Sequence, residues 1–214
     1  MTGIPENRRP LASRDTVWAR RAASWLVARD VSPNQISQLA MVFAALGFLA
    51  FALSWLAGSI LAGLLLLVAA VCCQARLICN LLDGMVAVEG GKAAKDGPFW
   101  NEAPDRVSDV LFLCGAGVAC GSPLLGAIAA IGALATAYMR ELGRAEGLGA
   151  DFSGPMAKQH RMAVLTAGAV LAAFQPLVWD GSVLRYALGL IILGTGVTVL
   201  RRSWRIIKGL KSRS

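Results

Sequence analysis

The stretch from Asn80 to Asp109, NLLDGMVAVEGGKAAKDGPFWNEAPDRVSD, is a polar segment in a chain that is otherwise mostly apolar. It holds six of the 13 acidic residues of the 214-residue chain: Asp83, Glu89, Asp96, Glu102, Asp105 and Asp109. Isolated carboxylates at membrane depth are costly, so a cluster of them is typical of a site that binds cations or substrates, or of an aqueous vestibule. The fold and the function therefore both depend on how this segment joins its neighbours.

Long apolar runs on both sides of the segment indicate a membrane protein. Hydrophobic residues make up 56% of the chain and charged residues 16%, whereas a soluble domain of this length carries more charge. A helix needs about 20 apolar residues to cross the hydrocarbon. The sequence therefore predicts an all-α integral membrane protein with six transmembrane helices, at 36–57, 59–82, 107–121, 123–139, 161–179 and 183–200.

The whole chain, 1–214, is predicted to be one membrane domain. Residues 1–35 form an interfacial N-terminal segment, 36–200 the six-helix bundle, and 201–214 a basic cytoplasmic tail. Within the first of these, TVWARRAASWLVARD (16–30) combines tryptophans on one helical face with arginines, which is typical of an amphipathic helix in the membrane interface. An ordinary juxtamembrane connector is the alternative.

The basic residues predict the orientation. Of the 21 Lys and Arg residues, 19 fall in or beside the N-terminal segment, the loops 83–106 and 140–160, and the C-terminus. The positive-inside rule places all four regions in the cytoplasm, and we expect a bacterial inner membrane. The net charge of +8 is then explained by contact with anionic lipid, so nucleic acid is not an expected partner.

Oxygen-bearing side chains on either side of the 83–106 loop are spaced to share helical faces. Asn101, Asp105 and Asp109 follow one another at intervals of four, and Asn80 and Asp83 are three apart. Oxygen ligands without paired His or Cys favour Mg²⁺, Mn²⁺ or Ca²⁺, and two divalent ions about 4 Å apart are common at sites of displacement at phosphorus. The alternative is that the acids solvate the loop and that Asn101 caps the third span.

The spacing of these residues resembles the signature of the CDP-alcohol phosphotransferase (CDP-alcohol phosphatidyltransferase) family, D-x2-D-G-x2-A-R-x8-G-x3-D-x3-D. Every interval fits without a gap, and SPNQIS (32–37) is similar to the family's TPNxIT entry to its first span. The signature is a variant, because two of its aspartates and its arginine are replaced. The matching residues here are Asn80, Asp83, Gly84, Ala87, Val88, Gly97, Asn101 and Asp105.

The resemblance implies a reaction in which an alcohol attacks the β-phosphorus of a CDP-linked substrate and CMP leaves. We expect CDP-diacylglycerol as the donor, a small alcohol, phosphorylated or not, as the acceptor, one or two Mg²⁺ or Mn²⁺ ions, and a homodimer. Asp105 is the implied catalytic base. The implied metal ligands are Asn80, Asp83, Asn101 and Asp105, and the nearby acids Glu89, Glu102 and Asp109 are candidates to restore the lost charge, with Glu102 taken as a further ligand.

The same resemblance places the nucleotide beside small residues of the signature. The expected nucleotide-binding residues are Asn34, Gly84, Ala87 and Gly97, and a cap on the first span is an equal alternative for Asn34. A second basic cluster is expected to bind the phosphate of an acceptor such as glycerol 3-phosphate or inositol phosphate, although the positive-inside rule alone would also explain it. This cluster consists of Arg140, Arg144, Lys158 and Arg161.

Two other functions remain open at this point. A catalytically silent member of the family that binds a CDP-lipid or acts as a subunit is favoured by Asn80, Val88 and Asn101. A small transporter is disfavoured, because the acids cluster at the ends of spans and transport sites usually lie near the midplane.

Overall fold

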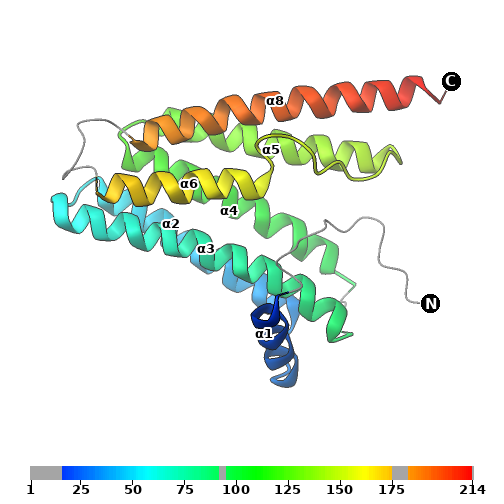
Figure 1. The fold of residues 1–214 in the computed structure, drawn as a ribbon, viewed down its shortest axis with the longest axis horizontal. Helices are drawn as coiled ribbons and strands as arrows, with labels where there is room; N and C mark the ends of the chain where they lie inside the picture. The colour runs from blue at the N-terminus through cyan, green and yellow to red at the C-terminus, as the bar shows by residue number, and fades with distance from the viewer. Residues whose placement is uncertain (1–15, 92–94, 175–182, 214) are drawn as a thin grey trace.

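The computed structural model describes residues 16–91, 95–174 and 183–213. Within these residues the chain forms seven helices and no strand (Figure 1). The helices are α1 (Val17–Ala28), α2 (Pro33–Ser54), α3 (Ser59–Glu89), α4 (Gly97–Ala119), α5 (Pro123–Ala145), α6 (Lys158–Ala173) and α8 (Val183–Lys211).

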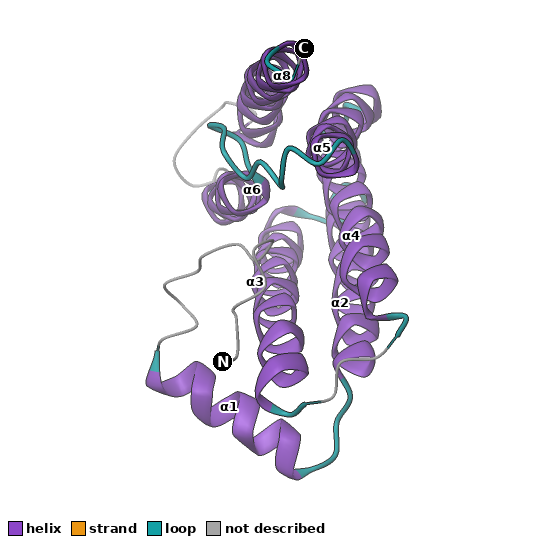
Figure 2. Ribbon diagram, turned by 90° about the vertical axis from the view of Figure 1, so that its right-hand side faces the viewer, coloured by secondary structure: helices purple, strands orange, loops and turns teal. Residues whose placement is uncertain are grey.

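Six of these helices pack side by side into a closed ring. Going round the ring, α2 contacts α3, α3 contacts α6, α6 contacts α8, α8 contacts α5, α5 contacts α4, and α4 returns to α2. Helix α1 lies at an angle to the bundle and packs on α3 (Figure 2). Ala19 and Ala23 on its inner side are fully buried, whereas Trp18 and Trp25 are exposed. The segment is helical, and its role as an amphipathic helix in the membrane interface stays a prediction.

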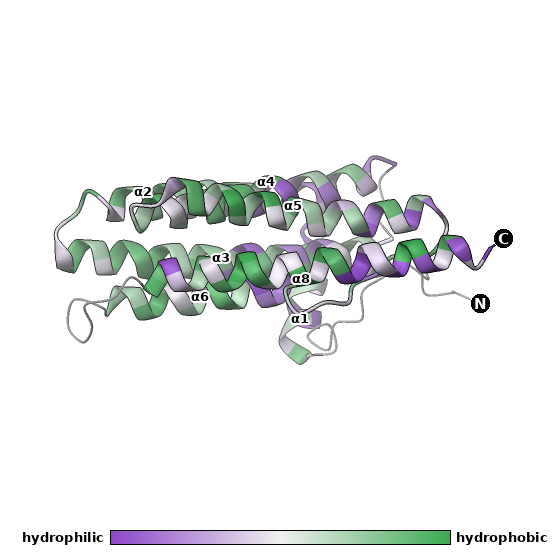
Figure 3. Ribbon diagram, turned by 90° about the horizontal axis from the view of Figure 1, so that it is seen from above, coloured by the Kyte–Doolittle hydropathy of each residue, from purple (hydrophilic) through white to green (hydrophobic). Residues whose placement is uncertain are grey.

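The hydropathy of the helices is compatible with a multi-pass membrane protein. Helices α2, α3, α5 and α8 are long and apolar enough to cross a membrane. Figure 3 shows mostly hydrophobic residues in the half of the bundle that contains the α2–α3 turn, and hydrophilic residues gathered in the half toward the C-terminal end of α8. The all-helical class is confirmed. The count of six spans stays a prediction, and part of the fifth span, 175–179, lies outside the described residues.

The starts of α2 and α4 correct two of the expected caps. Ser32 caps α2 in a capping box with Gln35, so the alternative that Asn34 is the cap is wrong. Helix α4 begins at Gly97 with Asp96 in the N-cap position, so Asn101 lies inside the helix and does not cap it. The polar residues after Gly97 therefore face the bundle from a regular helix.

Glycines hold α4 and α5 in a tight hairpin. The turn between them contains Gly121, whose φ of +65° lies in the left-handed region that favours glycine. A Cβ added at Gly126 would lie 2.6 Å from the main-chain oxygen of Leu113 and 2.9 Å from the Cα of Gly117. Since both are main-chain atoms, the two helices would have to move apart to admit a side chain.

We expect Gly126→Ala to destabilise the protein by about 1–3 kcal/mol through overpacking, which lowers the apparent Tm by several degrees. Thermal unfolding of the detergent-purified protein would measure the change. Gly196→Ala is the matched control, because nothing lies within 4 Å of a Cβ there and alanine favours the helix. Equal Tm values for the two variants would contradict the close packing of α4 on α5.

Candidate active site

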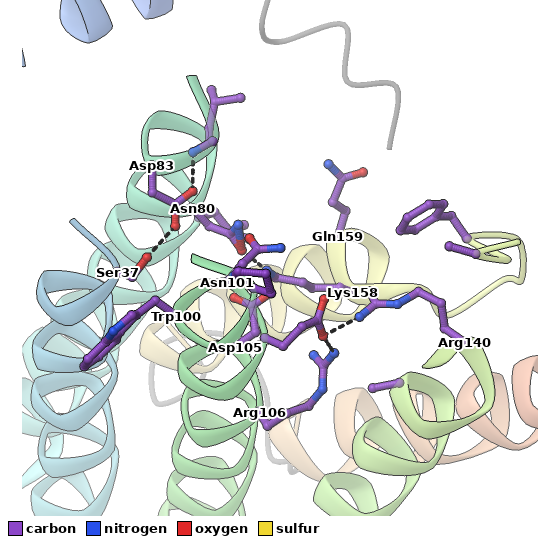
Figure 4. A pocket seen from close by; sticks show the side chains of 18 of the residues that line it. Ser37, Asn80, Asp83, Trp100, Asn101, Asp105, Arg106, Arg140, Lys158 and Gln159 are labelled. Carbon is purple, nitrogen blue, oxygen red and sulfur yellow. Dashed lines mark hydrogen bonds and ion pairs between the residues drawn. The ribbon is translucent and has the colours of Figure 1, made fainter. Parts of the chain in front are cut away.

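A cavity of about 810 Å³ lies between the helices of the bundle, lined by residues of all seven helices and of the loop between α5 and α6. The structure brings every predicted site residue to its wall: Asn34, Asn80, Asp83, Gly84, Ala87, Gly97, Asn101, Glu102, Asp105, Arg140, Arg144, Lys158 and Arg161. Figure 4 shows that the labelled side chains converge from α2, α3, α4, α5 and α6. Their individual roles stay predictions.

Asp83 is buried near the end of α3 and is held by two donors. The hydroxyl of Ser37 in α2 donates to its Oδ2 at 2.8 Å, and the main-chain N–H of Gly84 donates to its Oδ1 at 2.6 Å. These bonds fix the direction of the carboxylate and join α3 to the first turns of α2.

Asp105 in α4 is held by two cations. The Nη2 of Arg76, a fully buried side chain in α3, donates to Asp105 Oδ1 at 2.9 Å and to its main-chain oxygen at 3.1 Å. The ammonium of Lys158, the first residue of α6, donates to Asp105 Oδ2. Both carboxylate oxygens therefore face a positive charge.

Lys158 also reaches the other signature helix. Its Nζ donates to the amide oxygen of Asn80 in α3, so one ammonium bridges α3 and α4. Figure 4 shows the lysine side chain extending from α6 toward Asn80 and Asp105. The side chain is only 18% exposed, so water screens these contacts little.

A buried ion pair lies beside these contacts. Arg161 in α6 donates to Asp109 Oδ2 in α4 at 2.6 Å, and Arg76 lies 3.6 Å from Asp109 Oδ1. Asp109 is fully buried and does not line the cavity, which argues against the hypothesis that it restores the charge lost from the signature. The guanidinium of Arg161 is 2% exposed and bound to Asp109, which weakens its case as an acceptor ligand.

The other two candidates for restoring charge lie apart from the signature oxygens. The Oε2 of Glu102 accepts hydrogen bonds from Arg106 and Arg140, so this carboxylate neutralises arginines. Glu89 is exposed at the end of α3 and does not line the cavity. Neither adds to the donor set around Asp83 in this arrangement, although Glu102 remains at the cavity wall.

The nucleotide residues expected from the signature lie on one wall of the cavity. Gly84, Ala87 and Gly97 present little or no side chain there, which leaves space for a ligand. The Nδ2 of Asn34 donates to both oxygens of Asp96, at 3.2 and 3.3 Å, and the indole N–H of Trp100 donates to Asp96 at 2.9 Å. Asn34 thus ties the start of α4 to α2.

The loop between α5 and α6 covers another side of the cavity, through Ala150 and Phe152. Asp151 anchors this loop to α8, because it accepts a hydrogen bond from Arg205 at 3.1 Å. Within the loop, the Ser153 N–H donates to the same carboxylate at 2.8 Å. Partial burial alone would raise the pKa of Asp151, but the bonds from Ser153 and the charge of Arg205 lower it overall.

The cavity offers oxygen donors from both signature helices to a divalent ion. Among the described residues no three His, Cys, Asp or Glu side chains are placed to hold a metal ion. The oxygens available are the carboxylates of Asp83 and Asp105 and the amides of Asn80 and Asn101, and the Lys158 ammonium lies among them. Mg²⁺ often binds one or two carboxylates together with substrate phosphates. An ion completed by phosphate oxygens is therefore consistent with these residues, and the number of ions stays a prediction.

The charges at the wall favour an anionic ligand. Six cationic side chains and four carboxylates line the cavity, an excess of two positive charges. The carboxylates are Asp83, Glu102, Asp105 and Glu141, and the cations are Arg106, Arg140, Arg144, Lys158, Arg161 and Arg202.

Arg76 and Ser37 are among the residues around the site that the sequence analysis missed. Arg76 could have been found, because it is an arginine within an apolar span, one helical turn before Asn80, and such residues usually serve a site. Ser37 is the last residue of SPNQIS, but nothing in the pattern marked its hydroxyl as the partner of Asp83.

No known protein-family description and no curated protein matches the chain. Solved structures do match, among them Mycobacterium tuberculosis phosphatidylinositol phosphate synthase PgsA1. Its complex with manganese and citrate has a TM-score of 0.74 at 20% identity, covering 88% of each chain. Its CDP-DAG-bound form also has a TM-score of 0.74 at 20% identity, covering 88% of this chain and 92% of that one.

The apo form of the same enzyme gives a TM-score of 0.68 at 19% identity, over 85% of this chain and 92% of that chain. PgsA1 is a CDP-alcohol phosphatidyltransferase. The chain therefore has the fold of an enzyme of this class, and the resemblance seen in the signature is confirmed at the level of the fold.

We expect Arg161→Met to destabilise the protein by about 3–5 kcal/mol, because it leaves Asp109 buried without its closest cation. The apparent Tm in detergent should fall by about 10 °C. Arg205→Met is the control, since its pair with Asp151 is partly exposed and worth less than about 1 kcal/mol. Similar Tm losses in the two variants would show that the buried ion pair contributes no more to stability than the exposed one.

Proposed function

We propose that the chain is a CDP-alcohol phosphatidyltransferase that moves a phosphatidyl group from CDP-diacylglycerol to a small alcohol and releases CMP. One observation carries the proposal: the signature residues of α3 and α4, spaced as in the family, line one cavity together. The fold shared with PgsA1, which has been solved with CDP-DAG bound, supports the choice of donor.

The cavity wall suits the donor. Small residues at Gly84, Ala87 and Gly97 leave space for the cytidine nucleotide, and the excess of positive charge attracts its pyrophosphate. The cavity is lined by many polar residues of an otherwise apolar bundle, which would let the acyl chains remain among lipids while the nucleotide enters.

In the reaction, the acceptor hydroxyl oxygen forms a bond to the β-phosphorus, and the bond between that phosphorus and the oxygen of CMP breaks. Asp105 takes the hydroxyl proton as general base. Lys158 and nearby arginines stabilise the negative charge on the phosphate that departs with CMP. A divalent ion, Mg²⁺ or Mn²⁺, would be held by Asp83 and Asp105 with the amides of Asn80 and Asn101, and would neutralise pyrophosphate charge.

Arg140 and Arg144 favour a phosphorylated acceptor. Both line the cavity from α5, and Arg140 is oriented by Glu102 and by Glu141, whose Oε1 accepts from its Nε at 2.9 Å. Guanidinium groups held in this way suit a phosphate such as that of glycerol 3-phosphate or inositol phosphate. Arg161 also lines the cavity, but its guanidinium is paired with Asp109.

The proposal includes the cellular setting. We infer six spans, cytoplasmic termini, a bacterial inner membrane and a homodimer. The distribution of basic residues supports the orientation, and the family resemblance supports the dimer. The site would then open to the cytoplasm and the inner leaflet, where a CDP-lipid can diffuse laterally.

A catalytically silent protein that binds a CDP-lipid is the second candidate. Asn80 and Asn101 replace two carboxylates, and both oxygens of Asp105 accept hydrogen bonds from cations. A base that must first release Lys158 would work slowly or not at all. Turnover by the purified protein separates the two candidates.

We expect Asp105→Asn to lower the rate of CMP release by about 10²–10⁴-fold, because the amide cannot accept the hydroxyl proton. Release from CDP-diacylglycerol would be followed with Mg²⁺ or Mn²⁺ and a panel of acceptors: glycerol 3-phosphate, inositol phosphate, inositol, serine and choline. The control is Glu89→Gln, which removes an acid outside the cavity and should leave the rate unchanged.

Wild-type turnover that persists in Asp105→Asn would refute the assigned base. A wild-type protein that binds CDP-diacylglycerol but releases no CMP with any acceptor would favour the silent protein instead.

A further inference from the structure

We propose that the ammonium group of Lys158 is a built-in cation of this site and takes the place of a second divalent ion. The inference deepens the proposed function, because the ligand concerned is the diphosphate of a cytidine nucleotide. It rests on one juxtaposition: the Nζ of Lys158 donates both to Asn80 Oδ1 and to Asp105 Oδ2, between the two signature helices.

The replaced residues and the lysine complement each other chemically. A carboxylate at position 80 would place a second negative charge beside Asp105, whereas the neutral amide of Asn80 accepts a hydrogen bond from the ammonium and adds no charge. Asp105 then supplies the single negative charge that balances Lys158. The change from aspartate to asparagine and the presence of the lysine are thus two parts of one arrangement.

The surrounding cluster is electrically balanced with the lysine in place. Three cations pair with two carboxylates: Asp105 pairs with Arg76 and Lys158, and Asp109 pairs with Arg161 and Arg76. Asp83 carries the third negative charge, and within the described part of the chain its hydrogen-bond donors are the neutral Ser37 hydroxyl and the Gly84 N–H. One divalent ion beside Asp83, with the diphosphate, keeps this balance, but a second ion next to Lys158 would meet a like charge.

The lysine is held where it is by the packing of α6. It is the first residue of that helix, and Arg161, three residues later, is buried and bound to Asp109. The side chain is mostly covered and lines the cavity. An ammonium has three donors, and two are used by Asn80 and Asp105, so the third is available to a phosphate oxygen.

Two binding measurements test the proposal with CDP as the probe. Electron paramagnetic resonance of free Mn²⁺, with saturating CDP and detergent-purified protein, should give one bound Mn²⁺ per chain. Calorimetry in EDTA should show that Lys158→Met weakens CDP binding by about tenfold or more, since a charge-assisted hydrogen bond is lost. Lys158→Arg should retain most of the affinity, because it keeps the positive charge.

Lys208→Met is the matched control. Lys208 is exposed on α8, beside Trp204 and away from the cavity, so its loss should leave CDP binding unchanged. Two Mn²⁺ per wild-type chain would overturn the proposal, and so would equal affinities for CDP in EDTA of the wild type and a folded Lys158→Met. The metal count uses the wild type alone, so a misfolded variant would not prevent the test.

The outcome is separable from that of the proposed function. One Mn²⁺ per chain and lysine-dependent CDP binding, without CMP release, would refute catalysis and retain the built-in cation. Two Mn²⁺ per chain with CMP release would retain the enzyme and refute the built-in cation.

Discussion

The buried ion pair between Arg161 and Asp109 sets the register in which α6 meets α4, and Arg76 extends the contact to α3. Charged groups in so dry a place are costly unless each has its partner, so the three helices are constrained to the arrangement that keeps the charges paired. Asn80 lies one helical turn after Arg76, Asp105 one turn before Asp109, and Lys158 one turn before Arg161. The residues of the site therefore lie one helical turn away from the ion-paired residues, on the same three helices.

The apolar and the polar parts of the bundle have different roles. The apolar helices pack closely, as where Gly126 of α5 approaches α4. Polar residues of the same bundle line the cavity. Asp83 accepts hydrogen bonds from neutral donors, so its negative charge is available to a metal ion. Asp105 accepts hydrogen bonds from two cations. The variant signature thus redistributes charge within a shared fold.

Much of the fold could be predicted from the sequence, because hydropathy and turn residues are local signals. The helices and the turn at Gly121 follow from such signals, and the interfacial role of α1 stays a prediction. The gathering of the signature residues around one cavity followed from helical spacing. The start of α4 was misjudged because Asn101 is a good capping residue, while the helix in fact begins earlier, at Gly97.

The contacts between distant helices could not be predicted in the same way. Lys158 is 53 residues from Asp105 in the chain, and no local pattern links them. The sequence grouped Lys158 and Arg161 together as basic residues, but packing separates their partners, so that one enters the donor set and the other pairs with Asp109. Helical spacing placed Asp109 on the same face as Asp105, but its carboxylate forms a buried ion pair with Arg161. Such outcomes depend on which helices are neighbours.

The most direct measurement is the anomalous scattering of manganese in crystals of the protein with CDP-diacylglycerol. The account predicts one anomalous peak per chain beside Asp83, with the Lys158 ammonium bonded to Asn80 and Asp105. Two peaks about 4 Å apart, with Lys158 turned away from the signature helices, would contradict it.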